Sequence, residues 1–177
     1  ADSNATSPDG WSSWKESLML QLHSTTRAFL NEGREEYSRK LDTDRLALRN
    51  EVIGIMREDY HPDVRVHFEQ MPGAAFNFRQ ATQIVTQVRT VRHFLKWETD
   101  KGDPAASCIK WIDHTEKGYS EMVLATRDKP QLLEKICCAF ASEQINILSA
   151  DLFTRKDKIV VNIFRVCTTN FEPVSSV

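Results

Sequence analysis

Several features that mark particular protein classes are scarce or absent in this sequence of 177 residues. Six glycines and six prolines are too few for a collagen-like or a proline-rich disordered chain. No apolar run reaches the roughly 18 residues of a membrane-spanning helix, and the polar residues 1–10 predict no signal peptide. The 23 basic residues do not outnumber the 25 acidic ones, whereas a general nucleic-acid-binding protein carries a basic excess. What remains, 41% hydrophobic and 27% charged, is typical of a globular protein.

Residue patterns that carry enzymatic chemistry are also missing. There is no glycine-rich phosphate-binding loop, no Gly-x-Ser-x-Gly motif and no pair of histidines four residues apart. We interpret His61, Asp63 and His67 as the solvated polar start of a helix rather than a metal site. The sequence therefore predicts no catalytic residue, metal or cofactor in this chain. The four cysteines form no Cys-x-x-Cys pair, so we expect free thiols in a reducing cytoplasm: Cys108, Cys137, Cys138 and Cys167.

Residues 11–99 have the apolar spacing of helices. Ser13 and Glu16 match a capping box, which predicts that a first helix begins there. Further helices are predicted over 44–59, 62–70 and 79–96. Asp44 lies near the start of the first of these, and Pro62 limits it and opens the next, which Met71-Pro72-Gly73 ends. The polar face of the last helix is predicted to carry four basic residues: Arg79, Arg89, Arg92 and Lys96.

A breaker-rich stretch at 100–104 predicts a boundary, after which the apolar pattern changes. The order that follows is strand, strand, helix, strand, strand, with the elements predicted over 107–113, 119–127, 130–144, 145–154 and 159–168. This order is typical of a split β-α-β unit, in which the helix crosses over and the last strand fills the gap that it leaves. The sequence thus predicts an α+β fold with a helical region followed by a sheet.

Both ends of the chain suggest a piece of a longer protein. Ser3-Asn4-Ala5 looks like the remnant of a cleaved expression tag, so residues 1–10 are set aside as a tag remnant or disordered segment. At the other end, residues 170–177 form no closing element. We therefore expect catalytic motifs of the parent protein to lie outside this sequence.

The turn between the strand 119–127 and the following helix is the best candidate for a binding site. Pro130 is predicted to open the helix, which leaves unpaired backbone N–H groups beside Asp128 that can receive a carboxylate. Asn146 begins the next strand and is expected to approach the same end of the sheet, where its amide offers an acceptor and two donors. Two interpretations stay open: these residues hold the polar head of an amino-acid ligand, or Asp128 only caps the helix and Asn146 only makes a turn. Spacing alone favours the second.

Four segments around this turn carry a resemblance to a known family: Arg127-Asp128-Lys129-Pro130, Ile145-Asn146-Ile147-Leu148-Ser149-Ala150, Phe153-Thr154-Arg155-Lys156-Asp157 and Asn162-Ile163-Phe164-Arg165-Val166. They resemble an ACT module, a regulatory β-α-β-β-α-β domain that commonly binds amino acids, and are closest to the first ACT module of bacterial protein-PII uridylyltransferases. Upstream, Trp14-Lys15-Glu16-Ser17-Leu18 resembles the helix that follows the hydrolase domain of that family. The resemblance covers roughly residues 11–171.

The resemblance implies helical linkers over 11–99 and, over 107–171, an incomplete ferredoxin-like ACT module that lacks its last helix and strand. The parent would be a cytoplasmic nitrogen sensor that transfers UMP from UTP to the PII signalling protein, with Mg²⁺, and removes it again. Glutamine, sensed by the ACT modules, would set the balance, while this chain itself would be non-catalytic. The ligand-binding residues implied are Asp128, Lys129, Pro130, Gln131 and Asn146.

The chain departs from the family pattern at Gln131, where many ACT modules have a glycine that allows close approach of the ligand. An alternative therefore stays open: a ferredoxin-like protein-interaction module that binds no small molecule. Without the module's last strand, the edge of 119–127 would be bare, and we expect the strand 107–113 to occupy it. Otherwise that edge should pair with a second chain, forming a homodimer through sheet edges.

Overall fold

The structure is a computed structural model that describes residues 13–102 and 106–174, without the side chains of residues 13–18 and 21. The chain divides between residues 46 and 47 into two compact units, and their relative placement is not determined. In the first unit, helix α2 (Ser13–Glu32) is followed by the start of helix α3 (Arg34–Ile55). The rings of Phe29 and Tyr37 pack edge to face across this connection, with centroids 5.8 Å apart. The capping box predicted at Ser13 and Glu16 involves side chains outside the described set.

The predicted start of the second helix, near Asp44, is wrong. Helix α3 begins ten residues earlier, at Arg34, directly after Gly33, whose φ of 78° lies in the left-handed region. Glu35 and Glu36 in the first turn favour the helix start because they face the positive end of the helix dipole. A single glycine thus separates α2 from α3, and Asp44 lies inside a continuous helix.

The second unit begins with helical elements that match the predicted breakers. After the short 3-10 turn η1 (Glu58–Tyr60), helix α4 (His61–Gln70) has Pro62 in its first turn and ends where Met71 becomes extended. A second 3-10 turn, η2 (Gly73–Phe76), leads to helix α5 (Ala81–Lys101), which Gln80 and Gln83 cap reciprocally. The buried side of α5 comprises mainly apolar residues, among them Ile84, Val88, Val91 and Phe94.

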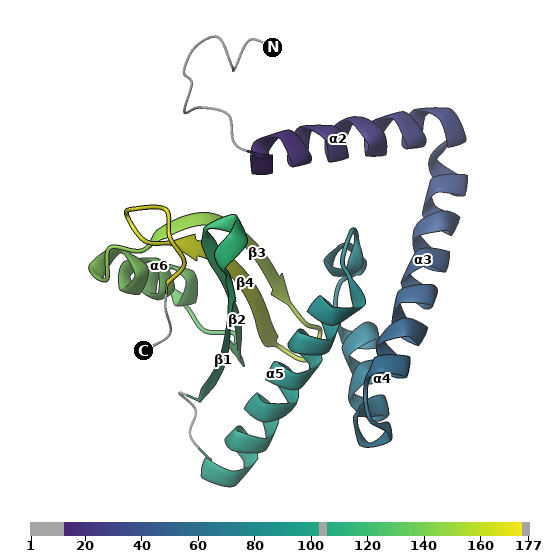
Figure 1. Cartoon of the computed structure of the whole chain (residues 1–177). Helices are drawn as coiled ribbons and strands as arrows, with labels where there is room; N and C mark the ends of the chain where they lie inside the picture. Colours follow the sequence, from purple (N-terminus) through teal and green to yellow (C-terminus); the bar gives the residue numbers. More distant parts are fainter. Residues whose placement is uncertain (1–12, 103–105, 175–177) are drawn as a thin grey trace. The chain divides into compact units, whose positions relative to one another are not determined.

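The sheet has four antiparallel strands in the spatial order β1-β2-β4-β3 (Figure 1). Their bounds are β1 Ser107–His114, β2 Tyr119–Arg127, β3 Asn146–Thr154 and β4 Ile159–Cys167. Helix α6 (Leu132–Ser142) crosses from β2 to β3, and β4 fills the gap between them. This confirms both the split β-α-β unit and the prediction that the strand at 107–113 pairs with 119–127.

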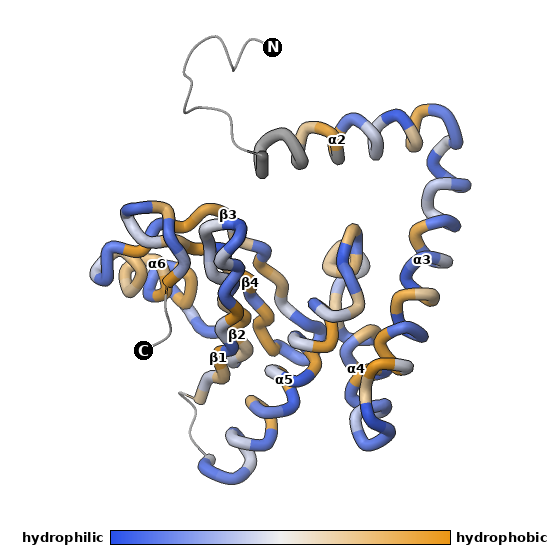
Figure 2. The backbone as a smooth tube through the Cα atoms, viewed as in Figure 1, coloured by the Kyte–Doolittle hydropathy of each residue, from blue (hydrophilic) through white to orange (hydrophobic). Residues whose placement is uncertain are grey.

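Helices cover both faces of the sheet. On one face, α5 and the end of α3 form a core with inward residues of β2 and β4, such as Ala125, Ile159 and Val161. On the other face, Phe140 of α6 packs on Phe164 of β4, with ring centroids 5.4 Å apart. Hydrophobic segments accordingly run along β2 and β4 in Figure 2. The predicted α+β class is confirmed, and residues 47–99 of the predicted helical region fold together with the sheet.

The polar residues near the start of α4 do not form one solvated group, as the sequence suggested. A ring nitrogen of His61 lies 3.1 Å from the carbonyl oxygen of Met56, and Asp63 accepts a hydrogen bond of 3.0 Å from Arg92. His67 is instead buried in the core, with its Nε2 3.3 Å from Gln87 Oε1. The prediction failed because His67 lies six residues, nearly two helical turns, beyond His61, on the side of α4 that faces α5.

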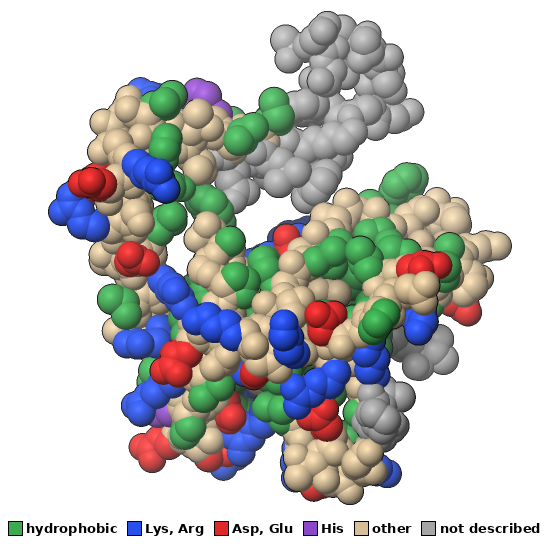
Figure 3. All heavy atoms as spheres, turned by 180° about the vertical axis from the view of Figure 1, so that it is seen from behind, with side chains coloured by type: hydrophobic (Ala, Val, Ile, Leu, Met, Phe, Trp, Pro, Cys, Tyr) green, Lys and Arg blue, Asp and Glu red, His purple; other side chains and the backbone are tan. Residues whose placement is uncertain are grey.

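The basic residues predicted on the polar face of α5 also have different environments. Arg79 precedes the helix and pairs with Asp151 of β3 at 2.6 Å, whereas Arg92 pairs with Asp59 and Asp63 and stacks on Tyr60. Basic and acidic side chains lie interspersed on the surface shown in Figure 3, which agrees with such pairing. All four cysteines are free thiols, as predicted. Within the described ranges, no helix has the length and apolar character needed to cross a bilayer.

Candidate ligand-binding site

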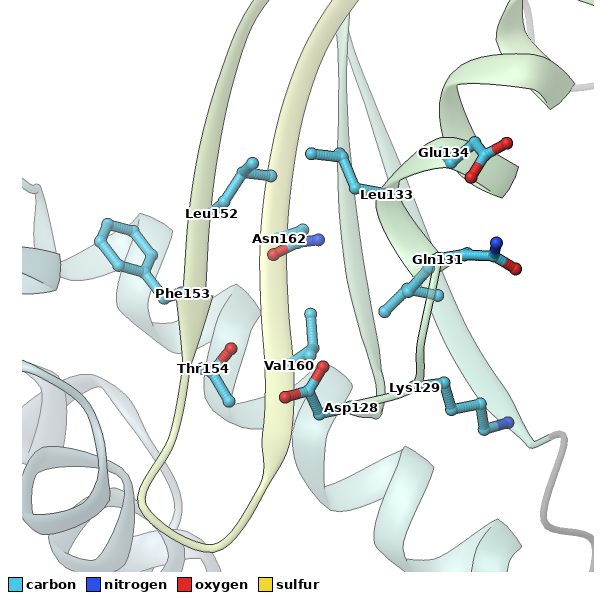
Figure 4. Close-up of a pocket in the computed structure, with 11 residues that line it drawn as sticks. Asp128, Lys129, Gln131, Leu133, Glu134, Leu152, Phe153, Thr154, Val160 and Asn162 are labelled. Atoms are coloured by element: carbon cyan, nitrogen blue, oxygen red, sulfur yellow. The ribbon is translucent and has the colours of Figure 1, made fainter.

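A pocket of about 320 Å³ lies where the chain leaves β2 and enters α6. The turn and the first residues of α6 form one wall, and the facing ends of β3 and β4 form the other (Figure 4). Its lining residues are Asp128, Lys129, Gln131, Leu132, Leu133, Glu134, Leu152, Phe153, Thr154, Val160 and Asn162. Three of the five residues implied by the family resemblance are thus brought together: Asp128, Lys129 and Gln131.

Backbone hydrogen bonds hold the turn that forms this wall. The N–H of Asp128 donates to Lys158 O at 3.0 Å, and the N–H of Leu132 donates to Lys129 O at 3.2 Å. The N–H groups of Leu133 and Glu134 have no acceptor among the described residues. Unpaired N–H groups at the start of a helix attract an anionic group such as a carboxylate.

The helix does not open at Pro130, as the sequence predicted. It begins at Leu132, because Gln131 adopts a left-handed conformation with φ 61° and serves as the N-cap without a side-chain hydrogen bond. A residue with a Cβ is strained in this region by about 1–2 kcal/mol, and only glycine adopts it freely. The position where the resemblance to ACT modules leads one to expect glycine is therefore one where the backbone itself favours glycine.

We expect Gln131→Gly to raise the free energy of unfolding by roughly 0.5–1 kcal/mol, because relief of the strain exceeds the extra flexibility of glycine. Gln131→Val should lower it by about 1 kcal/mol or more, since a β-branched residue is least tolerant of positive φ. Urea unfolding of both variants measures these changes. Gln144, also at positive φ (55°), provides a Gln→Gly comparison outside the pocket. A loss of stability in Gln131→Gly would contradict the strain argument.

Asn146 does not share the pocket, so the expectation of a common rim with Asp128 is wrong. Asn146 pairs with Cys167 at the start of β3, whereas Asp128 follows Arg127, which pairs with Ile159 at the opposite end of β4. The reason is that β2 and β3 are parallel in this sheet, so the crossover helix returns the chain to the end where β2 began. The exposed Asn146 amide donates to Thr168 O at 3.3 Å and joins the start of β3 to the residue that follows β4.

Asn162 is the pocket residue that the sequence did not single out. It lies on β4, its side chain faces the same space as Asp128 and Leu133 in Figure 4, and it is only 5% exposed. The ends of the Lys129 and Gln131 side chains point away from it. A polar residue in the alternating apolar pattern of a strand is the one signal that could have identified it.

The turn is also tied to α5 on the other side of the sheet. Arg127, the residue before Asp128, donates to both carboxylate oxygens of Glu98, each at 2.7 Å, and to Asp157 O at 3.0 Å. The hydrogen bond from Arg127 holds the pKa of the Glu98 carboxyl below its usual value. One bidentate ion pair, between Arg127 and Glu98, therefore links the turn at the pocket to α5.

Comparisons with known proteins give a consistent result. A bifunctional uridylyltransferase/uridylyl-removing enzyme of Rhodospirillum rubrum is 29% identical over 168 residues, covering 93% of this chain and 17% of the enzyme. Enzymes of the same name from Aliivibrio fischeri and Haemophilus influenzae are 25% and 24% identical, cover 98% of the chain, and are matched over 19% and 20% of their own lengths. No family model and no solved structure matches. The resemblance to uridylyltransferases seen in the sequence is thus confirmed: over nearly its whole length the chain is similar to a segment of bifunctional uridylyltransferase/uridylyl-removing enzymes, and it spans less than a quarter of its relatives' length.

Proposed function

We propose that this chain is the glutamine-sensing, non-catalytic part of a bifunctional uridylyltransferase/uridylyl-removing enzyme. The similarity to such enzymes over 93–98% of the chain supports the parent. The β2-α6-β3-β4 order, with a pocket at the start of α6, supports an incomplete ACT module as the sensor. The observation that carries the proposal is the juxtaposition of unpaired N–H groups, the Asp128 carboxylate and apolar walls in that pocket.

These groups fit the two charges of an amino acid. The N–H groups of Leu133 and Glu134 receive its carboxylate, and Lys129 at the rim adds positive charge. Asp128 binds its ammonium group, and Leu152 provides an apolar wall. Asp128 is exposed in this chain, so a second module is needed to close the site. We therefore expect this chain alone to bind glutamine weakly or not at all.

Ligand binding would act on the rest of the protein through α5. A ligand that fixes Asp128 also restrains Arg127, whose ion pair with Glu98 holds α5 to the sheet. At the N-terminal end of α5, Arg79 is bound to Asp151 of β3, the strand whose next residue, Leu152, lines the pocket. Glutamine would thereby shift a population between arrangements that favour uridylyl transfer and uridylyl removal.

The activities themselves belong to the parent. There, in the cytoplasm, a transferase domain attaches UMP from UTP to the PII signalling protein and a hydrolase domain removes it. Mg²⁺, which the resemblance implies for the parent, finds no cluster of three or more His, Cys, Asp or Glu side chains among the residues described here.

A second candidate function is a protein-interaction module that binds no small molecule. The observation that favours it is the edge strand β3, where Ile147, Leu148 and Leu152 are 39%, 38% and 43% exposed. An apolar strand edge of this kind can pair with a strand of another chain, here as a homodimer. The exposed Gln131 side chain beside the pocket is compatible with this function as well.

Calorimetric titration of the full-length protein with glutamine separates the two candidates. We expect saturable binding that Asp128→Asn weakens by about tenfold, because the neutral amide loses the charge-assisted hydrogen bond to the ligand ammonium. Asp100→Asn, an exposed aspartate at the end of α5, is the matched control and should bind as the wild type does. Absence of binding, together with an unchanged dimerisation constant, would favour the interaction module.

A further inference from the structure

We propose that Asn162 selects ligands with a side-chain carboxamide and rejects those with a side-chain carboxylate. This inference rests on the proposed function, because it assigns a specificity-determining residue to the same pocket. Glutamine would be accepted and glutamate refused by one amide on β4.

The position of Asn162 is unusual for a polar side chain. Its neighbours on the same face of β4 are Val160 and Phe164, which are 4% and 0% exposed, and Asn162 itself is 5% exposed. Its side chain lines the pocket, and neither of its amide atoms is among the side-chain atoms of the described residues that are both fully buried and unpaired. An amide that opens into the pocket adds less apolar burial than leucine would, so it does little for the stability of the fold. The amide is explained if its partner is a ligand.

The chemistry of the amide favours a carboxamide. Asn162 presents one acceptor and two donors, and a primary amide can pair with it through two hydrogen bonds in opposite directions. A carboxylate offers acceptors only, so the Asn162 oxygen would face a negatively charged oxygen. The Asp128 carboxylate, which lines the same pocket, adds repulsion for any second negative charge. No arginine and only one lysine, Lys129, lines the pocket to offset it.

The test compares glutamine and glutamate by calorimetric titration of the full-length protein. The wild type should bind glutamine at least about tenfold more tightly than glutamate, and Asn162→Leu should lose roughly tenfold or more in glutamine affinity and most of that preference. Asn170→Leu, at an exposed asparagine outside the pocket, is the control and should bind as the wild type does. Urea unfolding should find Asn162→Leu at least as stable as the wild type, since leucine has nearly the same shape and needs no hydrogen bond.

Each other result overturns the inference in a recognisable way. If Asn162→Leu keeps both the glutamine affinity and the preference, Asn162 is not the selecting residue, but glutamine sensing stands. The same holds if the wild type binds glutamine and glutamate equally. If Asn162→Leu is folded but much less stable, the amide has a structural role instead. If the wild type binds no glutamine, the proposed function fails together with this inference.

Discussion

Acidification from pH 7 to pH 4 should lower the free energy of unfolding of this protein by roughly 3 kcal/mol through His67 alone, because its pKa falls from 6.5 to about 3 on folding. In the unfolded chain His67 binds a proton below about pH 6.5, whereas in the folded chain it stays neutral down to about pH 3. Stability is therefore fully present above pH 6.5 and is lost as the pH falls toward 3.

The low pKa of His67 has a structural cause. Burial is the largest contribution, since the residue is 1% exposed, and the positive charge of Arg155 lowers the pKa further. The hydrogen bond with Gln87 and the charge of Asp157 act in the opposite direction but are weaker. The second ring nitrogen, Nδ1, has no hydrogen-bond partner in the described structure, so a proton there would add an unpaired buried charge.

Urea unfolding at pH 7, 5 and 4 measures the effect. His67→Phe, which keeps an aromatic ring but cannot titrate, should lose about 3 kcal/mol less than the wild type over this range. His93→Phe removes an exposed histidine of α5 and should retain the wild-type pH dependence. Equal pH dependence in the wild type and His67→Phe would show that His67 does not carry the effect. Because the wild type and His67→Phe share every other titrating group, the difference between these two isolates His67.

The sheet could be predicted from the sequence because its signals are local. Alternation of apolar residues and the breakers between them placed all four strands to within a residue or so, and the lead-in strand was paired correctly through its tight turn. The burial of His67 could not be predicted, because it depends on which side of α4 faces α5. The predicted start of helix α3 is too late because aspartate often caps a helix, whereas Asp44 lies within this one.

The candidate site was predicted in part, for a similar reason. Asp128, Lys129 and Gln131 are neighbours in sequence, so one turn brings them to one pocket. To place Asn146, the direction of β3 relative to β2 must be known, and the crossover puts Asn146 at the end of the sheet opposite to Asp128. Asn162 contributes from a distant strand, and its role becomes visible only when β4 is placed beside α6. The left-handed conformation of Gln131 has no signature in a glutamine side chain.

The turn between β3 and β4 gives the second large expected effect. Asp157→Asn should lower the free energy of unfolding by roughly 2–4 kcal/mol, because it leaves the Arg155 guanidinium buried without its counter-ion. Arg155 has a side chain that is 2% exposed and donates to both carboxylate oxygens of Asp157, at 3.0 and 2.7 Å. Urea unfolding measures the loss, and Arg39→Gln, which breaks a pair of side chains that are 74% and 54% exposed, should change stability by less than about 0.5 kcal/mol.

A double variant decides whether the buried charge is the cause. Arg155→Met combined with Asp157→Asn removes both charges and keeps an apolar chain of similar length, so it should recover at least about half of the loss. Arg155 lies beside His67, and the double variant should therefore also raise the pKa of His67 and weaken the pH dependence of stability. If the double variant is as unstable as Asp157→Asn, the buried charge is not the cause, and the loss comes from the effect of Asp157→Asn on the turn. The backbone hydrogen bond from the Arg155 N–H to Ile159 O, 2.8 Å long, is kept in both variants.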